Sequence, residues 1–222
     1  NGPGGTNPGV VSTVDTTSTA GPDTVIDASI TAPGAAFMLY DGNLNRLYIS
    51  GGNQLTMLDV SQSVPMAISG SPIAIPTVQP SSRTAPGDPC SATAPATLNT
   101  VAVTSLPDGS RAYVGSYYED LSNNICPQVT VIDAASNTIK SSIAIPGFPA
   151  FDTFCSASPA SRFRVMMASA GDSSRAYLSS CDGGNVNIID TSTDTYIGNL
   201  PAPVGSRLQN PPQNPVFLIA GP

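Results

Sequence analysis

The sequence predicts an all-β protein, and two features carry that prediction. The first is composition: 20 glycines and 22 prolines among 222 residues, with abundant Ser, Thr, Val and Ile, are typical of short strands separated by frequent turns. The chain has one lysine and one glutamate, whereas helix-rich proteins use these residues freely. The second feature is an internal repeat of about sixty residues, the usual sign of a repeated structural unit.

Three segments of the chain, 37–62, 101–136 and 165–193, share one order of elements. Each reads as an apolar strand, a turn, an Arg-x-Tyr strand, a loop and a strand that ends in aspartate. The arginines are 65 and 64 residues apart (111 − 46 and 175 − 111). A fourth apolar stretch such as SSIAIPG follows, so each unit is expected to form four short antiparallel strands. The recurring residues are Arg46, Arg111 and Arg175, Tyr48, Tyr113 and Tyr177, and Asp59, Asp133 and Asp190.

The strand-ending aspartates are expected to have a structural role. Asp133 with Ser136, and Asp190 with Thr193, are placed to fold back onto nearby backbone amides as Asx and Ser/Thr turns. For the repeated arginines, pairing with turn groups or with a neighbouring unit is the corresponding expectation.

The segments LPDGSRAYVGS and VTVIDAASNTI resemble the YVTN-type repeats of bacterial and archaeal surface proteins. The resemblance covers about two thirds of the chain, and it implies a β-propeller, in which four-stranded antiparallel blades are arrayed around an axis. It also places the chain near lactonase-like propellers.

On this interpretation, residues 10–222 form a single propeller domain or part of one, after a flexible spacer at 1–9. Whole blades are expected at about 33–78, 97–147 and 160–204, with a partial blade from 10–32 and 213–222. Residues 10–32 look like the third and fourth strands of a blade, and QNPVFLIAGP looks like a first strand. Three explanations stay open: a fragment of a longer propeller, termini that meet, or a terminal strand that completes a neighbouring molecule.

The four cysteines are expected to form two disulfides. Laying the repeats over one another pairs Cys90 with Cys126 and Cys155 with Cys181, each bridge clipping a loop to its blade. Disulfides persist in oxidising compartments, so the expected location is extracellular or at the cell surface.

Composition also argues against several functions. A net charge of −7 and the lack of a basic cluster disfavour nucleic acids, and no apolar run is long enough for a spanning helix. Without histidine, the usual general base and metal ligand are missing. No cofactor is expected; Asp41–Asn45 and Asp182–Asn185 are similar to the start of a calcium loop, but plain turns are the preferred interpretation of both.

Three groups of residues are candidates for binding a protein or glycan, or another copy of the chain. Tyr117 and Tyr118 are expected in an exposed loop as an aromatic patch, the alternative being that they cover the neighbouring disulfide. The other candidates are the basic pair Arg162 and Arg164, and the terminal strand residues Val216, Phe217 and Leu218.

The function expected from the sequence is that of a non-enzymatic extracellular scaffold, a propeller that binds partners and assembles with itself by strand addition into a filament or surface layer. The alternative is a lactonase-like or other hydrolytic propeller that acts through carboxylates and a bound cation.

Overall fold

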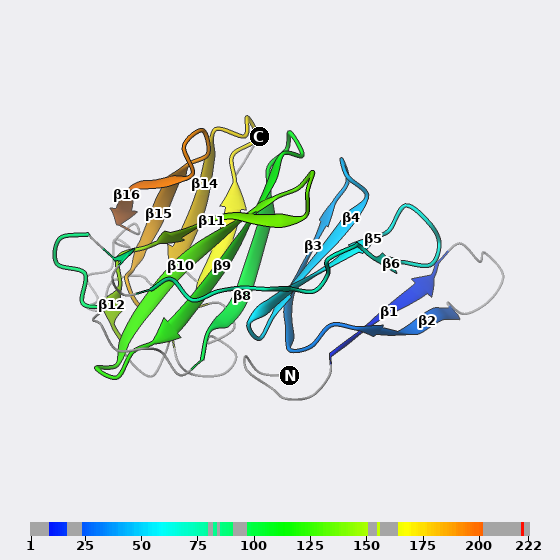
Figure 1. The fold of residues 1–222 in the computed structure, drawn as a ribbon, viewed down its shortest axis with the longest axis horizontal. Coiled ribbons are helices and arrows are strands. Elements are labelled where there is room, and N and C mark those ends of the chain that lie inside the picture. The colour runs from blue at the N-terminus through cyan, green and yellow to red at the C-terminus, as the bar shows by residue number, and fades with distance from the viewer. Residues whose placement is uncertain are drawn as a thin grey trace, which may run out of the picture.

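The computed structural model describes residues 9–16, 24–79, 82–83, 85–90, 97–150, 155, 164–201 and 219. Within these ranges the chain forms sixteen β-strands, all of whose pairings are antiparallel (Figure 1). The prediction of an all-β fold is therefore confirmed.

The strands form three sheets and a two-stranded ribbon. The ribbon consists of β1 (Val10–Asp15) and β2 (Thr24–Thr31). The first sheet contains β3 (Ala35–Asp41), β4 (Arg46–Gly51), β5 (Gln54–Asp59), β6 (Met66–Ala67) and β7 (Ile73–Ala74). The second sheet contains β8 (Asn99–Ser105), β9 (Arg111–Glu119), β10 (Asn124–Asp133), β11 (Thr138–Ala144) and β12 (Phe148–Pro149). The third sheet contains β13 (Val165–Ser169), β14 (Arg175–Ser180), β15 (Asn185–Asp190) and β16 (Thr195–Pro201).

The three sheets stand side by side in chain order, with the second between the first and the third (Figure 1). One apolar cluster joins the first sheet to the second through residues such as Tyr48, Met57 and Val114. Another joins the second sheet to the third through residues such as Val131 and Leu178. Face-to-face packing of consecutive antiparallel sheets is the architecture of a β-propeller, as the sequence predicts.

The register repeats from sheet to sheet. In each sheet the arginine that begins the second strand lies opposite the aspartate that ends the third. The tyrosine two residues later lies opposite an apolar residue, which is Met57, Val131 or Ile188. Because side chains alternate between the two faces of a strand, arginine, tyrosine and aspartate share one face of every sheet.

The ribbon repeats the third and fourth strands of the sheets. Asp15 lies opposite Thr24, as Asp133 lies opposite Thr138 in the second sheet and Asp190 opposite Thr195 in the third. All three pairs of strands have a register shift at the same place, which is just before the residue that precedes the aspartate. The ribbon therefore has the pairing that the sequence predicts for residues 10–32.

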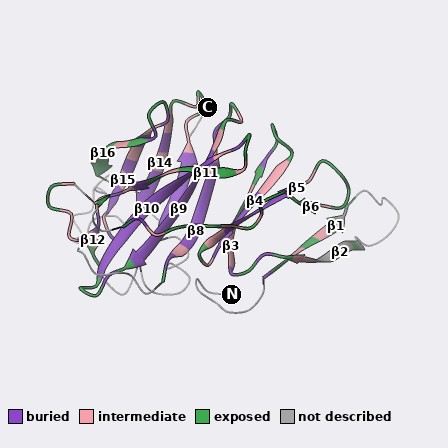
Figure 2. Ribbon diagram, viewed as in Figure 1, coloured by how far each residue is buried: buried purple, intermediate pink, exposed green. Residues whose placement is uncertain are grey.

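The ribbon begins beside the first sheet and projects away from it, at the end of the molecule opposite the third sheet (Figure 1). Val11 and Ile30 of the ribbon pack with Ile49 and Leu58 of the first sheet. The most thoroughly buried strands are β8, β9 and β10 of the second sheet, whereas Val10, Val14 and Val25 of the ribbon are exposed (Figure 2).

The predicted spacer and the predicted terminal strand lie almost wholly outside the described residues. The same holds for Arg162, Val216, Phe217 and Leu218. In the part of the chain that is described, no helix is long and apolar enough to cross a membrane.

Candidate functional site

The first contact between neighbouring sheets is made by Arg46. Its guanidinium reaches the second sheet and donates to the backbone carbonyl of Ala134, with Nη1 and O separated by 3.0 Å. The same guanidinium lies over the Tyr48 ring, 5.7 Å from its centroid, and donates to the tyrosine hydroxyl. Burial raises the pKa of Tyr48, so the hydroxyl stays neutral.

Arg111 makes the equivalent contact from the second sheet to the third. It donates to the carbonyl of Thr191 and to the carboxylate of Asp194, with Nη1 and Oδ1 separated by 3.0 Å. Tyr113 donates to the same carboxylate oxygen at 2.6 Å, and Lys140 pairs with the other oxygen at 2.7 Å. Burial and the hydrogen bond to Asp194 both raise the pKa of Tyr113. The only lysine of the chain thus serves this contact between sheets.

The two acceptors occupy the same place in their sheets. Ala134 and Thr191 each follow a strand-ending aspartate directly. We call the donation from the repeated arginine to this carbonyl the clamp; it is made twice, from the first sheet to the second and from the second to the third.

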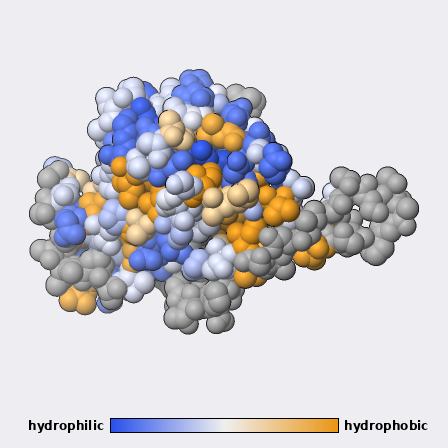
Figure 3. Space-filling model, turned by 45° about the vertical axis from the view of Figure 1, so that its right-hand side comes forward, coloured by the Kyte–Doolittle hydropathy of each residue, from blue (hydrophilic) through white to orange (hydrophobic). Residues whose placement is uncertain are grey.

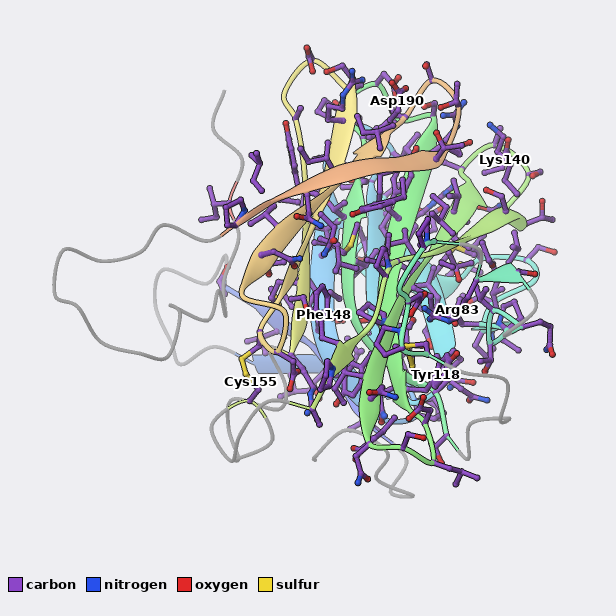
Figure 4. The ribbon with its side chains drawn as sticks, turned by 90° about the vertical axis from the view of Figure 1, so that its left-hand side faces the viewer. Arg83, Tyr118, Lys140, Phe148, Cys155 and Asp190 are labelled. Carbon is purple, nitrogen blue, oxygen red and sulfur yellow. A yellow bond between two sulfur atoms is a disulfide. The ribbon has the colours of Figure 1, made fainter. Side chains whose placement is uncertain are left out.

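Arg175, the third repeated arginine, makes no hydrogen bond or ion pair with another sheet among the described residues. Its guanidinium donates to the carbonyl of Ser174 at 2.7 Å and pairs with Asp190 of its own sheet at 3.1 Å. Its side chain is 37% exposed. Figure 4 views the third sheet from the side away from the second and shows Asp190 near the upper rim.

The side chains next to the repeated arginines also differ in burial, being more exposed in the third sheet than in the first two. Tyr48 with Met57 and Leu55, and Tyr113 with Val131 and Val129, are almost completely buried. Their counterparts in the third sheet, Tyr177 with Ile188 and Val186, are half-buried. Along β15 buried and half-buried residues alternate, whereas nine of the ten residues of β10 are buried.

The side of the third sheet that faces away from the second is called the open face here. It carries Arg175, Tyr177, Val186, Ile188 and, from β16, Leu200, which is 58% exposed. Met166 and Ala168 of β13 are buried, so the open face is formed by β14, β15 and β16.

The strand-ending aspartates form the predicted turns. The Oδ1 atoms of Asp59, Asp133 and Asp190 accept from the backbone amides of Ser61, Ser136 and Ser192 at 2.8–2.9 Å. These hydrogen bonds lower the pKa of all three carboxyl groups. In the third sheet the Ser192 hydroxyl and amide are the main donors to Asp190, and a backbone hydrogen bond from Thr193 lowers the pKa of this carboxyl further; the Thr193 hydroxyl bonds that of Thr195.

The predicted exposed patch at Tyr117 and Tyr118 is wrong. Both residues lie in strand β9, which continues to Glu119, and their exposed fractions are 5% and 0%. Arg83 donates to the Tyr118 hydroxyl at 2.9 Å and lies over its ring (Figure 4). A strand covered on both faces has no exposed loop to present these rings.

Arg164 is also buried, and it does not form part of a basic surface cluster. It makes a two-pronged ion pair with Asp182, with nitrogen–oxygen distances of 2.7 and 2.9 Å, and lies over the Tyr117 ring. Burial alone would lower the pKa of Arg164, but the hydrogen bonds and charge of Asp182 outweigh this effect and raise it. Asp182 is thus already engaged, which agrees with a structural role for 182–185.

Arg83 is a structural residue that the repeat does not reveal, because it lies in a connection between sheets. Besides Tyr118, it pairs with Asp88 and donates to the carbonyls of Ile145 and Pro127. Both members of the ion pair are almost fully buried, with exposed side-chain fractions of 1% and 3%. The arginine therefore fastens this connection to the second sheet.

The two disulfides join Cys90 to Cys126 and Cys155 to Cys181, the pairs that the aligned repeats predict. Cys126 lies within strand β10 and not in a loop. Gly147 passes so close to the first bridge that a Cβ there would lie 2.0 Å from the Cys90 sulfur. Only glycine fits this approach of backbone to sulfur.

The described residues offer little to a reactive centre. Within them, no group of three or more His, Cys, Asp or Glu side chains is arranged to hold a metal ion. The Oδ1 atom of Asp41 accepts from the amides of Asn43 and Leu44, which is a turn. A cleft of about 540 Å³ lies between β11 and the start of β16, and its charged residues Arg83, Asp88 and Asp194 are already engaged in ion pairs.

No protein-family model matches the chain, and no curated protein sequence is similar to it. Solved structures of similar fold include a proposed 6-phosphogluconolactonase from Bacteroides fragilis, at 11% identity and a TM-score of 0.45, covering 79% of this chain and 42% of the other. Apo AztD from Citrobacter koseri shares 14% identity at a TM-score of 0.35, with 81% and 52% covered. The β-propeller domain of Cps50 (Swd1) from Myceliophteria thermophila shares 12% identity at a TM-score of 0.31, with 74% and 58% covered. The chain spans about half the length of these structures.

The fold and the repeated clamps together define the class: the chain is a β-propeller protein, stabilised by two disulfides and by side chains that tie each sheet to the next.

Proposed function

We propose that the protein is a non-enzymatic extracellular scaffold of the YVTN-repeat type, which binds other protein surfaces and assembles with copies of itself. The observation that carries this proposal is the open face of the third sheet. It bears the same arginine and tyrosine that bind a neighbouring sheet twice elsewhere in the molecule, yet Arg175 pairs only within its own sheet.

The chemistry of the described residues supports a binding role over a catalytic one. The buried charged pairs Arg83–Asp88 and Arg164–Asp182 satisfy each other. The carboxylates near the turns accept from serine amides, which lowers their pKa and leaves them poor general bases. Two disulfides support a location in an oxidising compartment.

The test is to express the chain with its disulfides formed and to measure its mass in solution by light scattering over a range of concentrations. We expect the average mass to rise with concentration. A mass that stays at 22.5 kDa throughout would contradict self-assembly. A calcium-dependent increase in the unfolding temperature together with hydrolysis of a lactone would contradict the non-enzymatic role.

A further inference from the structure

The ribbon exposes the face that packs against a preceding sheet elsewhere in the molecule. In the second and third sheets, the residue before the strand-ending aspartate is Ile132 or Ile189, and each is completely buried against the sheet before it. The equivalent residue of the ribbon is Val14, which is 46% exposed. Val10, four residues earlier on the same side, is 58% exposed.

The second strand of the ribbon also exposes a residue whose counterparts in the other sheets pack between sheets. Val25 lies opposite Val14, in the place of Ile139 opposite Ile132 and of Tyr196 opposite Ile189. Ile139 and Tyr196 pack against the apolar clusters between sheets, whereas Val25 is 61% exposed. We call Val10, Val14 and Val25 the outer face of the ribbon; Figure 3 shows apolar residues where this arm leaves the body of the molecule.

The ribbon also presents the acceptor that a clamp needs. In both observed clamps the carbonyl belongs to the residue that directly follows the strand-ending aspartate. The residue that follows Asp15 is Thr16, which is exposed.

The molecule therefore carries two matching halves of one interface. The open face of the third sheet supplies Arg175 and the half-buried Tyr177 and Ile188, and the ribbon supplies three exposed valines and the Thr16 carbonyl. The two halves lie at opposite ends of the molecule (Figure 1), so a single chain in this arrangement does not bring them together.

We propose that the ribbon of one copy packs on the open face of the third sheet of a second copy, with Arg175 donating to the carbonyl of Thr16. This proposal rests on the self-assembly proposed above and names its two surfaces. The partner is a second copy because this chain itself displays the complementary apolar face and the carbonyl acceptor. Contacts of this head-to-tail kind close into a ring or continue as a filament, depending on the rotation between copies.

The contact removes two exposed apolar surfaces from water at once, which is its driving force. It also supports a two-stranded ribbon, which is marginally stable without further packing. Arg175 would exchange a partly exposed ion pair with Asp190 for the hydrogen bond that Arg46 and Arg111 already make.

Cross-linking tests the geometry directly. All four native cysteines are in disulfides, so Thr16→Cys and Ser174→Cys each add one free thiol while keeping Arg175 and the Thr16 carbonyl. With a short bis-maleimide, we expect covalent dimers when the two variants are mixed and none when either is treated alone. A chain that carries both substitutions and cross-links within itself at high dilution would overturn the second copy as partner. Dimers without a 16–174 link in the mixture would overturn the choice of surfaces.

Substitution tests the energetics. Arg175→Glu and Val14→Asp should each raise the dissociation constant of self-association at least about tenfold, because each places a carboxylate in an apolar contact. Leu121→Asp is the matched control: this residue is 76% exposed in the turn between β9 and β10, away from both surfaces, and should change the constant less than about twofold.

The two proposals fail in different ways. A protein that never associates contradicts self-assembly itself. A protein that associates equally well with Arg175→Glu and Val14→Asp contradicts only the surfaces named here. Circular dichroism of both variants at low concentration confirms that a lost association does not come from unfolding.

Discussion

The second and third sheets carry the same side chains at the same register but in different surroundings. In the second sheet, Arg111 and Tyr113 bind the turn of the next sheet and Tyr113 is completely buried. In the third sheet, Arg175 pairs within its own sheet and Tyr177 is half-buried. The comparison shows that the repeated motif stabilises the fold only where a following sheet supplies the carbonyl and the apolar surface.

The largest expected difference between the two sheets concerns the repeated tyrosine. Tyr113→Ala should lower the free energy of unfolding by about 3–5 kcal/mol, because it leaves a cavity between two sheets and removes a buried hydrogen bond. Tyr177→Ala should cost about 1–2 kcal/mol, since that ring is already partly in water. Urea unfolding at a concentration where the protein is monomeric measures both. An equal loss of unfolding free energy in the two variants would show that Tyr177 is as well packed as Tyr113, which would contradict the comparison.

The next test concerns Asp194, the carboxylate that Arg111 of the second sheet binds in the third sheet. Asp194→Asn should cost about 1–3 kcal/mol, since this carboxylate is buried and serves Arg111, Tyr113 and Lys140 together. The matched change Asp190→Asn alters a partly exposed ion pair with Arg175 and should cost clearly less. Thermal unfolding of the two variants side by side gives the order, and a reversed order would contradict the comparison.

Loss of the open arginine should hardly affect the single molecule. Arg175→Ala should change the free energy of unfolding of the monomer by about 0–1 kcal/mol, as is usual for a solvent-accessible ion pair. Arg46→Ala should cost more, because it removes a hydrogen bond between two sheets and the contact with Tyr48. Denaturant unfolding at low protein concentration distinguishes the two outcomes.

The smallest expected effect is that of pH near neutrality. The chain has no histidine, so stability should be almost constant between about pH 5 and 8. The lowered pKa of Asp59, Asp133 and Asp190 means that their ionised forms stabilise the fold above the unfolded value of about 3.9. That contribution is lost as pH falls through the lower, folded pKa values, so the unfolding temperature should fall below about pH 4. A transition between pH 5 and 8 would contradict this account.

The sequence predicted the local features because they depend on neighbours along the chain. Strand alternation and the turns at Asp133 and Asp190 can be read from a single repeat, and the spacing of the arginines can be read from comparing the repeats. The repeat also predicted how 10–32 pairs, since Asp15 and Thr24 occupy the places of Asp133 and Thr138. The prediction that Tyr117 and Tyr118 lie in an exposed loop is wrong because β9 is longer than the equivalent strand of the other sheets. The segments that cover this extension are not part of the repeat, so the sequence did not reveal its burial.

By itself, the sequence determined the all-β class, the order of strands in each unit, the residues that recur and the pairing of the cysteines, all of which follow from local periodicity and from comparing one repeat with the next. Only the tertiary structure decided which arginine binds a neighbouring sheet, that Arg83 and Arg164 are buried in ion pairs, and which faces stay open. The physical reason is that the burial of a side chain and its choice of partner depend on which sheet lies opposite. Motifs that are identical along the chain carry no information about that neighbour.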